Sequence, residues 1–196
     1  PGCVLVTGAA GFLGSRLVHE LLVTSAVKIT ALVRGPDRAA ARARLTIPKF
    51  IINASGDQFF LPDNSHLYWD KVREDKRIRY VENSKHNLPD TDAIDSLLAW
   101  YNSVITGAKR PEYSWAKGAD GSLTVATPDK PTEVKLWQAH SDTRDFRVEL
   151  IGNAYTSSVL QPQADGSYVA QVAKPEKGFT AFFVELTFDS SLANAP

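Results

Sequence analysis

The stretch VLVTGAAGFLGS at residues 4–15 joins a short apolar run to a glycine-rich turn and then to apolar residues repeating at helical spacing. Gly8 permits a tight turn, Gly11 lets the backbone approach a pyrophosphate, and Gly14 lets the helix pack closely on the strand. The free amides at the start of such a helix favour an anion. The stretch therefore predicts a strand–turn–helix unit that binds a dinucleotide phosphate.

Strand-like and helix-like segments continue to alternate up to residue 110. The further strands are predicted at residues 27–33, 49–54 and 78–81, and the helices at residues 37–45, 64–72 and 91–105. Such alternation is typical of an α/β fold. We therefore expect a Rossmann-like, mainly parallel sheet with flanking helices in a domain of residues 1–110.

After Pro111 the sequence changes to period-two alternation with turn signals and no helical pattern. The strands are predicted at residues 122–127, 133–139, 146–150, 167–172 and 180–188. These segments predict a small antiparallel β-sandwich as a second domain, residues 111–196. The boundary is placed near residues 108–112, where the two patterns meet.

Composition excludes several functional classes. The 196 residues carry 22 basic and 22 acidic side chains, so we expect neither a nucleic acid nor a membrane surface as partner. No apolar run is long enough to span a bilayer and no signal segment opens the chain, so the default expectation is a soluble, cytoplasmic protein. Cys3 is the single cysteine, and His66 and His140 lack the spacing of metal ligands, so neither an internal disulfide nor a metal site is predicted.

Residues 3–45, through the stretch VLVTGAAGFLGS, resemble the amino terminus of the extended short-chain dehydrogenases/reductases, the NAD-dependent epimerase/dehydratase family. In that family the end of the second strand selects the cofactor, and basic residues there imply NADP. Arginine matches a phosphate well because its guanidinium donates in a planar fork. The resemblance implies these cofactor contacts: Gly8, Gly11, Phe12, Leu13, Gly14, Arg34 and Arg38.

The catalytic pair of that family is a Tyr-x-x-x-Lys motif, in which the lysine lowers the pKa of the tyrosine. Tyr113 and Lys117 have this spacing. The family carries the pair on a long helix, whereas here Pro111 precedes it, Gly118 follows it and the surrounding pattern is β. The reductase catalytic set is therefore incomplete.

A second resemblance covers residues 46–188. The segments IPKFIINASGDQFFLPD (47–63), RYVENSKH (79–86) and GFTAFFVEL (178–186) are similar to the PhoPQ-activated pathogenicity-related protein family, whose fold is α/β-hydrolase-like. The resemblance implies that Asp57 is the acid and His86 the general base of a catalytic triad. No Gly-x-Ser-x-Gly elbow occurs in the sequence, so we expect this pair to be inactive.

Together the two resemblances suggest a chimera, natural or constructed. The first hypothesis is an NADP-binding module without complete catalytic machinery. The alternatives are an α/β-hydrolase-like protein that retains an Asp–His pair, and a designed or shuffled scaffold without activity. Apolar surface left uncovered at the junction would favour a homodimer.

Overall fold

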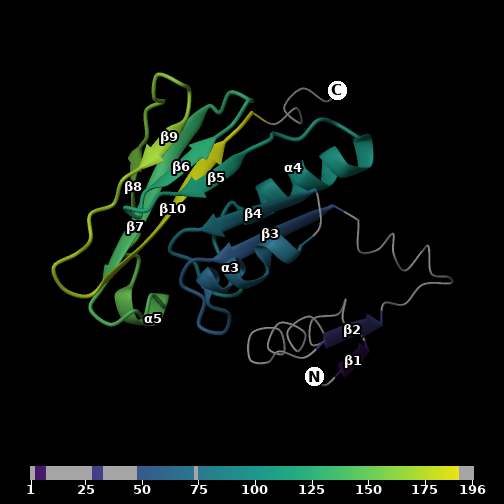
Figure 1. Cartoon of the computed structure of the whole chain (residues 1–196), viewed down its shortest axis with the longest axis horizontal. Helices are drawn as coiled ribbons and strands as arrows, with labels where there is room; N and C mark the ends of the chain where they lie inside the picture. Colours follow the sequence, from purple (N-terminus) through teal and green to yellow (C-terminus); the bar gives the residue numbers. More distant parts are fainter. Residues whose placement is uncertain (1–2, 8–27, 33–47, 73–74, 190–196) are drawn as a thin grey trace. The chain divides into compact units, whose positions relative to one another are not determined.

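A computed structural model describes residues 3–7, 28–32, 48–72 and 75–189 (Figure 1). The chain forms two compact units, one of Pro1–Lys49 and Asp63–Arg77, the other of Phe50–Pro62 and Ile78–Pro196. The predicted domain boundary near residues 108–112 lies inside the second unit and stays a prediction. No helix in the described part of the chain is long and apolar enough to cross a membrane.

The described residues of the first unit include a parallel strand pair and a short helical segment. Strand β1 (Cys3–Thr7) pairs with β2 (Lys28–Leu32). The single helix predicted at residues 64–72 is instead η1 (Pro62–Asn64), α3 (Ser65–Tyr68) and η2 (Trp69–Lys71). The ammonium group of Lys76 donates hydrogen bonds to the carbonyls of Trp69 and Val72, which satisfies acceptors at the end of this segment.

Strands β3 (Lys49–Ala54) and β4 (Lys76–Val81) form a second two-stranded sheet. The Lys49 amide donates to Asp75 O, and the Ser55 amide donates to Val81 O. Because the later residue of β3 bonds to the later residue of the partner strand, the two strands run parallel. Helix α4 (Ala93–Thr106) follows, and left-handed Gly107, with φ 70°, ends it. The bounds predicted for β3 are confirmed, and β4 begins two residues earlier than expected.

The second unit contains two three-stranded antiparallel sheets with a sandwich-like arrangement (Figure 1). One has the order β5-β6-β9, formed by Ser114–Lys117, Leu123–Ala126 and Tyr168–Ala170. The other has the order β10-β7-β8, formed by Phe179–Thr187, Glu133–Ser141 and Thr156–Val159. Strand β7 buries Val134 and Leu136 at alternate positions, as one face of a sheet requires.

One predicted strand of this region is a helix. Residues 146–150 were expected to be extended, but Val148–Ile151 form the single helical turn α5. The amides of Leu150 and Ile151 both donate to the carbonyl of Arg147, and Gly152, with φ 63°, ends the turn. A four-residue helix is too short to show a helical period, which is why its sequence reads as alternation.

An aromatic cluster holds β4 to the sheet of β10. The ring of Phe183 lies 5.5 Å from Tyr80, 6.4 Å from Trp137 and 5.8 Å from Tyr155, measured between ring centroids. These separations are those of favourable aromatic pairs. The cluster therefore fixes the strand that precedes His86 against the antiparallel sheet.

The prediction of a Rossmann-like, mainly parallel sheet with flanking helices is wrong. Among the described residues, parallel pairing is confined to two-stranded sheets, and the larger sheets are antiparallel. The alternation of strands and helices along a sequence fixes the order of the elements but does not decide which strands pair.

Candidate acid–base site

Asp57 occupies the turn that follows β3. Its carboxylate is largely buried, with 8% of the side chain exposed. One oxygen, Oδ1, accepts hydrogen bonds from the backbone amides of Phe59 at 2.7 Å and Phe60 at 2.9 Å. Aspartate commonly closes a turn in this way. The turn therefore fixes the carboxylate before any other side chain contacts it.

His86 lies in the loop after β4, and the structure brings it to Asp57. Its Nδ1 is 2.9 Å from Asp57 Oδ2, the oxygen that the turn leaves available. The imidazole is 38% exposed. When neutral His86 donates from Nδ1 to the carboxylate, its Nε2 carries the lone pair and serves as a base. The catalytic roles assigned to the two residues stay predictions.

Two aromatic rings pack against the imidazole. Measured between ring centroids, Phe59 lies 5.3 Å from His86 in an edge-on arrangement. Phe60 lies 5.1 Å from His86, with the two rings tilted to each other. Both phenylalanines belong to the turn that Asp57 closes. The same carboxylate therefore orients the imidazole directly, through Nδ1, and indirectly, through the two rings.

The two turns are also joined through the backbone. The Gly56 amide donates to Ser84 O at 3.1 Å, and the Ser84 hydroxyl donates to Val81 O at 2.6 Å. Gly56 has no room for a side chain, because an added Cβ would collide with Val148 Cγ2 and lie 2.9 Å from Val148 N. Close backbone packing thus sets the separation of Asp57 and His86.

The other predicted site residues are not part of this arrangement. The proposed NADP contacts lie outside the described residues: Gly8, Gly11, Phe12, Leu13, Gly14, Arg34 and Arg38. Tyr113 accepts a hydrogen bond from the amide of Ile78 and immediately precedes strand β5, which ends at Lys117. A strand does not place residues four apart side by side as a helix does, so the Tyr-x-x-x-Lys geometry is absent at this pair.

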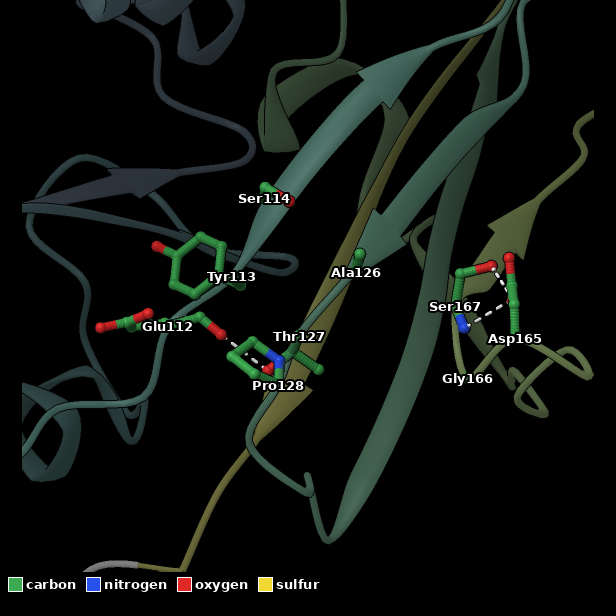
Figure 2. Close-up of a pocket in the computed structure, with 9 residues that line it drawn as sticks. All are labelled: Glu112, Tyr113, Ser114, Ala126, Thr127, Pro128, Asp165, Gly166 and Ser167. Carbon is green, nitrogen blue, oxygen red and sulfur yellow. Dashed lines mark hydrogen bonds between the residues drawn. The ribbon is translucent and has the colours of Figure 1, made fainter.

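An open hollow exists elsewhere in the second unit, at one end of the sheet β5-β6-β9 (Figure 2). It is lined by Glu112, Tyr113, Ser114, Ala126, Thr127, Pro128, Asp165, Gly166 and Ser167. Hydrogen bonds from Ser167 lower the pKa of Asp165, and Thr127 donates to the Glu112 carbonyl. These polar groups are satisfied by one another, and neither Asp57 nor His86 lines the hollow.

The remaining histidines among the described residues have different surroundings. His66 contacts the carbonyl of Asp63 through Nδ1, and His140 approaches Asp142 at 3.4 Å through Nε2. Within the described ranges, no group of three or more His, Cys, Asp or Glu side chains could hold a metal ion.

Sequence reasoning missed the residues that support the pair, including Phe59, Phe60, Asn83 and Val148. The two phenylalanines stand next to Asp57 in an aromatic doublet that could have suggested packing on a nearby ring. Asn83, whose side chain is hydrogen-bonded to the backbone of Tyr155, and Val148, which contacts Gly56, gave no local signal, because their partners are distant in the sequence.

An acid in the turn after one strand and a histidine in the loop after the next parallel strand is the order of the α/β-hydrolase class. The sequence profile of the PhoPQ-activated pathogenicity-related proteins matches residues 16–147. The chain belongs to this family.

The chain is also 28% identical, over 200 aligned positions, to autocrine proliferation repressor protein A of Dictyostelium discoideum. The alignment covers 90% of this chain and 40% of the relative, so the chain spans well under half of that protein. No solved structure matches the chain.

These matches correct the interpretation of the amino-terminal region. The family match begins at residue 16, inside the segment that resembles the reductases, and the comparisons give no sign of an NADP-binding unit. The assignment of residues 1–45 to a Rossmann-type short-chain dehydrogenase/reductase is therefore wrong. A glycine-rich turn between a strand and a helix is shared by too many folds to identify one family.

Proposed function

We propose that Asp57 and His86 are the acid and general base of an α/β-hydrolase-like site for acyl transfer, with esters as the substrate class. The observation that carries this proposal is the 2.9 Å contact between Asp57 Oδ2 and His86 Nδ1, with Asp57 Oδ1 already held by two amides. A carboxylate held in this way selects one tautomer of the histidine and stabilises the imidazolium.

The chemistry follows from the nitrogen that Asp57 leaves free. Nε2 of His86 takes a proton from a water molecule as the water oxygen attacks the ester carbonyl. The carbonyl carbon then expels the alcohol, and the imidazolium returns its proton to the leaving oxygen. Asp57 stabilises the positive charge on the ring between these two proton transfers.

The missing Gly-x-Ser-x-Gly elbow was the ground for expecting an inactive pair, and the mechanism proposed here differs from that expectation because water replaces the serine nucleophile. General acid–base catalysis alone contributes about 10²- to 10⁴-fold. We therefore expect slow hydrolysis, confined to esters with good leaving groups. The activity and substrates of the longer relative are not required by this proposal.

The test is hydrolysis of p-nitrophenyl acetate by the wild type, by His86→Ala and by the matched control His140→Ala. His140 is also an exposed histidine beside an aspartate. The proposal predicts that His86→Ala removes the rate above the buffer background and that His140→Ala retains it. A rate that survives His86→Ala, or falls equally in both variants, would contradict the proposal.

A further inference from the structure

The side chain of Asn83 ties the loop that carries His86 to the antiparallel sheets. Asn83 Nδ2 donates to Tyr155 O at 3.0 Å, and the Tyr155 amide donates to Asn83 Oδ1 at 2.9 Å. The amide side chain thus makes the same reciprocal pair of hydrogen bonds that two strands make in an antiparallel ladder. Asn83 stands three residues before His86, directly after β4 and Glu82.

The partner of Asn83 is itself immobilised. Tyr155 is 6% exposed, its ring packs on Phe183, and it directly precedes β8, which pairs with β7. A loop bonded to such a residue acquires the rigidity of the sheet. A site held by a rigid element keeps its geometry better than a site on a free loop.

The backbone of Asn83 is left-handed, with φ 48°. Among residues other than glycine, asparagine tolerates this conformation unusually well. The conformation turns the chain between β4 and the His86 loop, and in the same turn the side chain reaches Tyr155. Asn83 therefore shapes the loop and anchors it.

Two other contacts join the turns of Asp57 and His86 to helix α5, and both are weaker than the two hydrogen bonds between Asn83 and Tyr155. The Val148 amide donates to Gly56 O at 3.3 Å, on the side of Asp57. Lys85 and Glu149 form an ion pair at 3.5 Å with both side chains nearly half exposed, a type that contributes little. The two hydrogen bonds of Asn83 are therefore the main side-chain tie of the His86 loop to the sheets.

We propose that Asn83 is a positioning residue, which holds His86 at hydrogen-bond distance from Asp57 by anchoring its loop to Tyr155. This inference rests on the proposed acid–base function. Its distinctive consequence is that losing the Asn83 amide weakens the His86–Asp57 contact without removing any group that contacts substrate.

The principal variant is Asn83→Gly, which keeps the left-handed backbone free of strain and removes both side-chain hydrogen bonds. Asn83→Asp is the conservative variant, because it keeps the acceptor for the Tyr155 amide and replaces the donor by a carboxylate oxygen, which cannot bond to the Tyr155 carbonyl. The matched control is Asp90→Gly, at an exposed residue with φ 55° that also lies downstream of β4.

Two readouts are measured on each variant of the full chain: kcat and KM for p-nitrophenyl acetate, and the fraction of neutral His86 protonated at Nδ1, from ¹⁵N NMR. We expect Asn83→Gly to lower kcat about 10- to 100-fold, as misplaced catalytic groups do, with KM unchanged. The Nδ1–H fraction should fall as well. Asn83→Asp should be intermediate, and Asp90→Gly should match the wild type.

The outcomes separate this inference from the proposed function. If the wild type hydrolyses no ester, the proposed function fails, and the NMR readout still tests positioning. An unchanged Nδ1–H fraction in Asn83→Gly would overturn the positioning role. If Asn83→Gly does not fold, Asn83→Asp decides the question by the same NMR readout, and a wild-type value there overturns the role.

Discussion

The second unit holds two histidine–aspartate pairs, and their surroundings differ sharply. His86 and Asp57 are 2.9 Å apart, and the Asp57 side chain is 8% exposed. His140 and Asp142 are 3.4 Å apart, and the Asp142 side chain is 66% exposed and also 3.8 Å from Lys177. The residue types are the same in both pairs. The difference lies in what holds the carboxylate.

This contrast shows how the fold produces an acid–base pair. Asp57 is fixed by two backbone amides before it contacts His86, so the contact costs little side-chain entropy. Asp142 is exposed to solvent. Its contact with His140 is weak and costs the side-chain entropy of two exposed residues. Only the first pair can fix the tautomer of its histidine.

The largest expected effect comes from deleting the buried carboxylate. Asp57→Ala removes the charged acceptor of the part-buried amides of Phe59 and Phe60, and a hydrogen bond to a charged group contributes about 1.5–3 kcal/mol. Urea denaturation should show a loss of this size in the free energy of unfolding. Asp142→Ala, the matched control, should change the free energy by less than about 0.5 kcal/mol. Equal losses in the two variants would show that the pairs do not differ as described.

A third carboxylate sharpens the comparison, because one of the two oxygens of Glu82 lacks a hydrogen bond within the described part of the chain. Its Oε2 is buried and has no hydrogen-bond partner among the described residues. Burial raises the pKa of Glu82 above 4.5, and the nearby Glu185 and Asp92 raise it further, against backbone hydrogen bonding and Arg79. Both oxygens of Asp57 are thus hydrogen-bonded, whereas Oε2 of Glu82 has no such bond to a described residue.

A raised pKa in the folded state means that folding binds the Glu82 proton more tightly. The resulting stability is fully present below the ordinary pKa and is lost as the pH rises through the folded-state pKa. Wild type should therefore lose stability relative to Glu82→Gln as the pH rises from about 4, near the ordinary pKa of glutamate, toward neutrality. Urea titrations across this range measure it. An exposed control, Glu176→Gln, should follow the wild-type pH dependence, and parallel curves for wild type and Glu82→Gln would refute the prediction.

The sequence predicted best where one element carries its own signal. Strand β3 is built around the apolar run Phe50, Ile51 and Ile52, and its predicted bounds agree with the structure. Strands β5 and β8 were missed because all four residues of each are exposed, so neither shows the alternation that marks a half-buried strand. The parallel sheet was predicted wrongly because strand pairing is decided by tertiary contacts.

The acid–base site shows the same difference between local sequence signals and long-range contacts. Family resemblance identified Asp57 and His86, each at the end of a recognisable strand. The hydrogen bond between Asn83 and Tyr155 joins residues 72 positions apart, and the sequence around each residue does not indicate it. Sequence reasoning thus reached the two groups of the acid–base pair but not the contacts that position them.

The most direct test of the acid–base pair is the tautomer of each histidine, read from ¹⁵N NMR shifts at a pH where the rings are neutral. The account predicts that His86 carries its proton on Nδ1, donated to Asp57, while His140 shows no such preference. Asp57→Ala should abolish the preference of His86. A His86 ring protonated mainly on Nε2, or one indistinguishable from His140, would contradict the account.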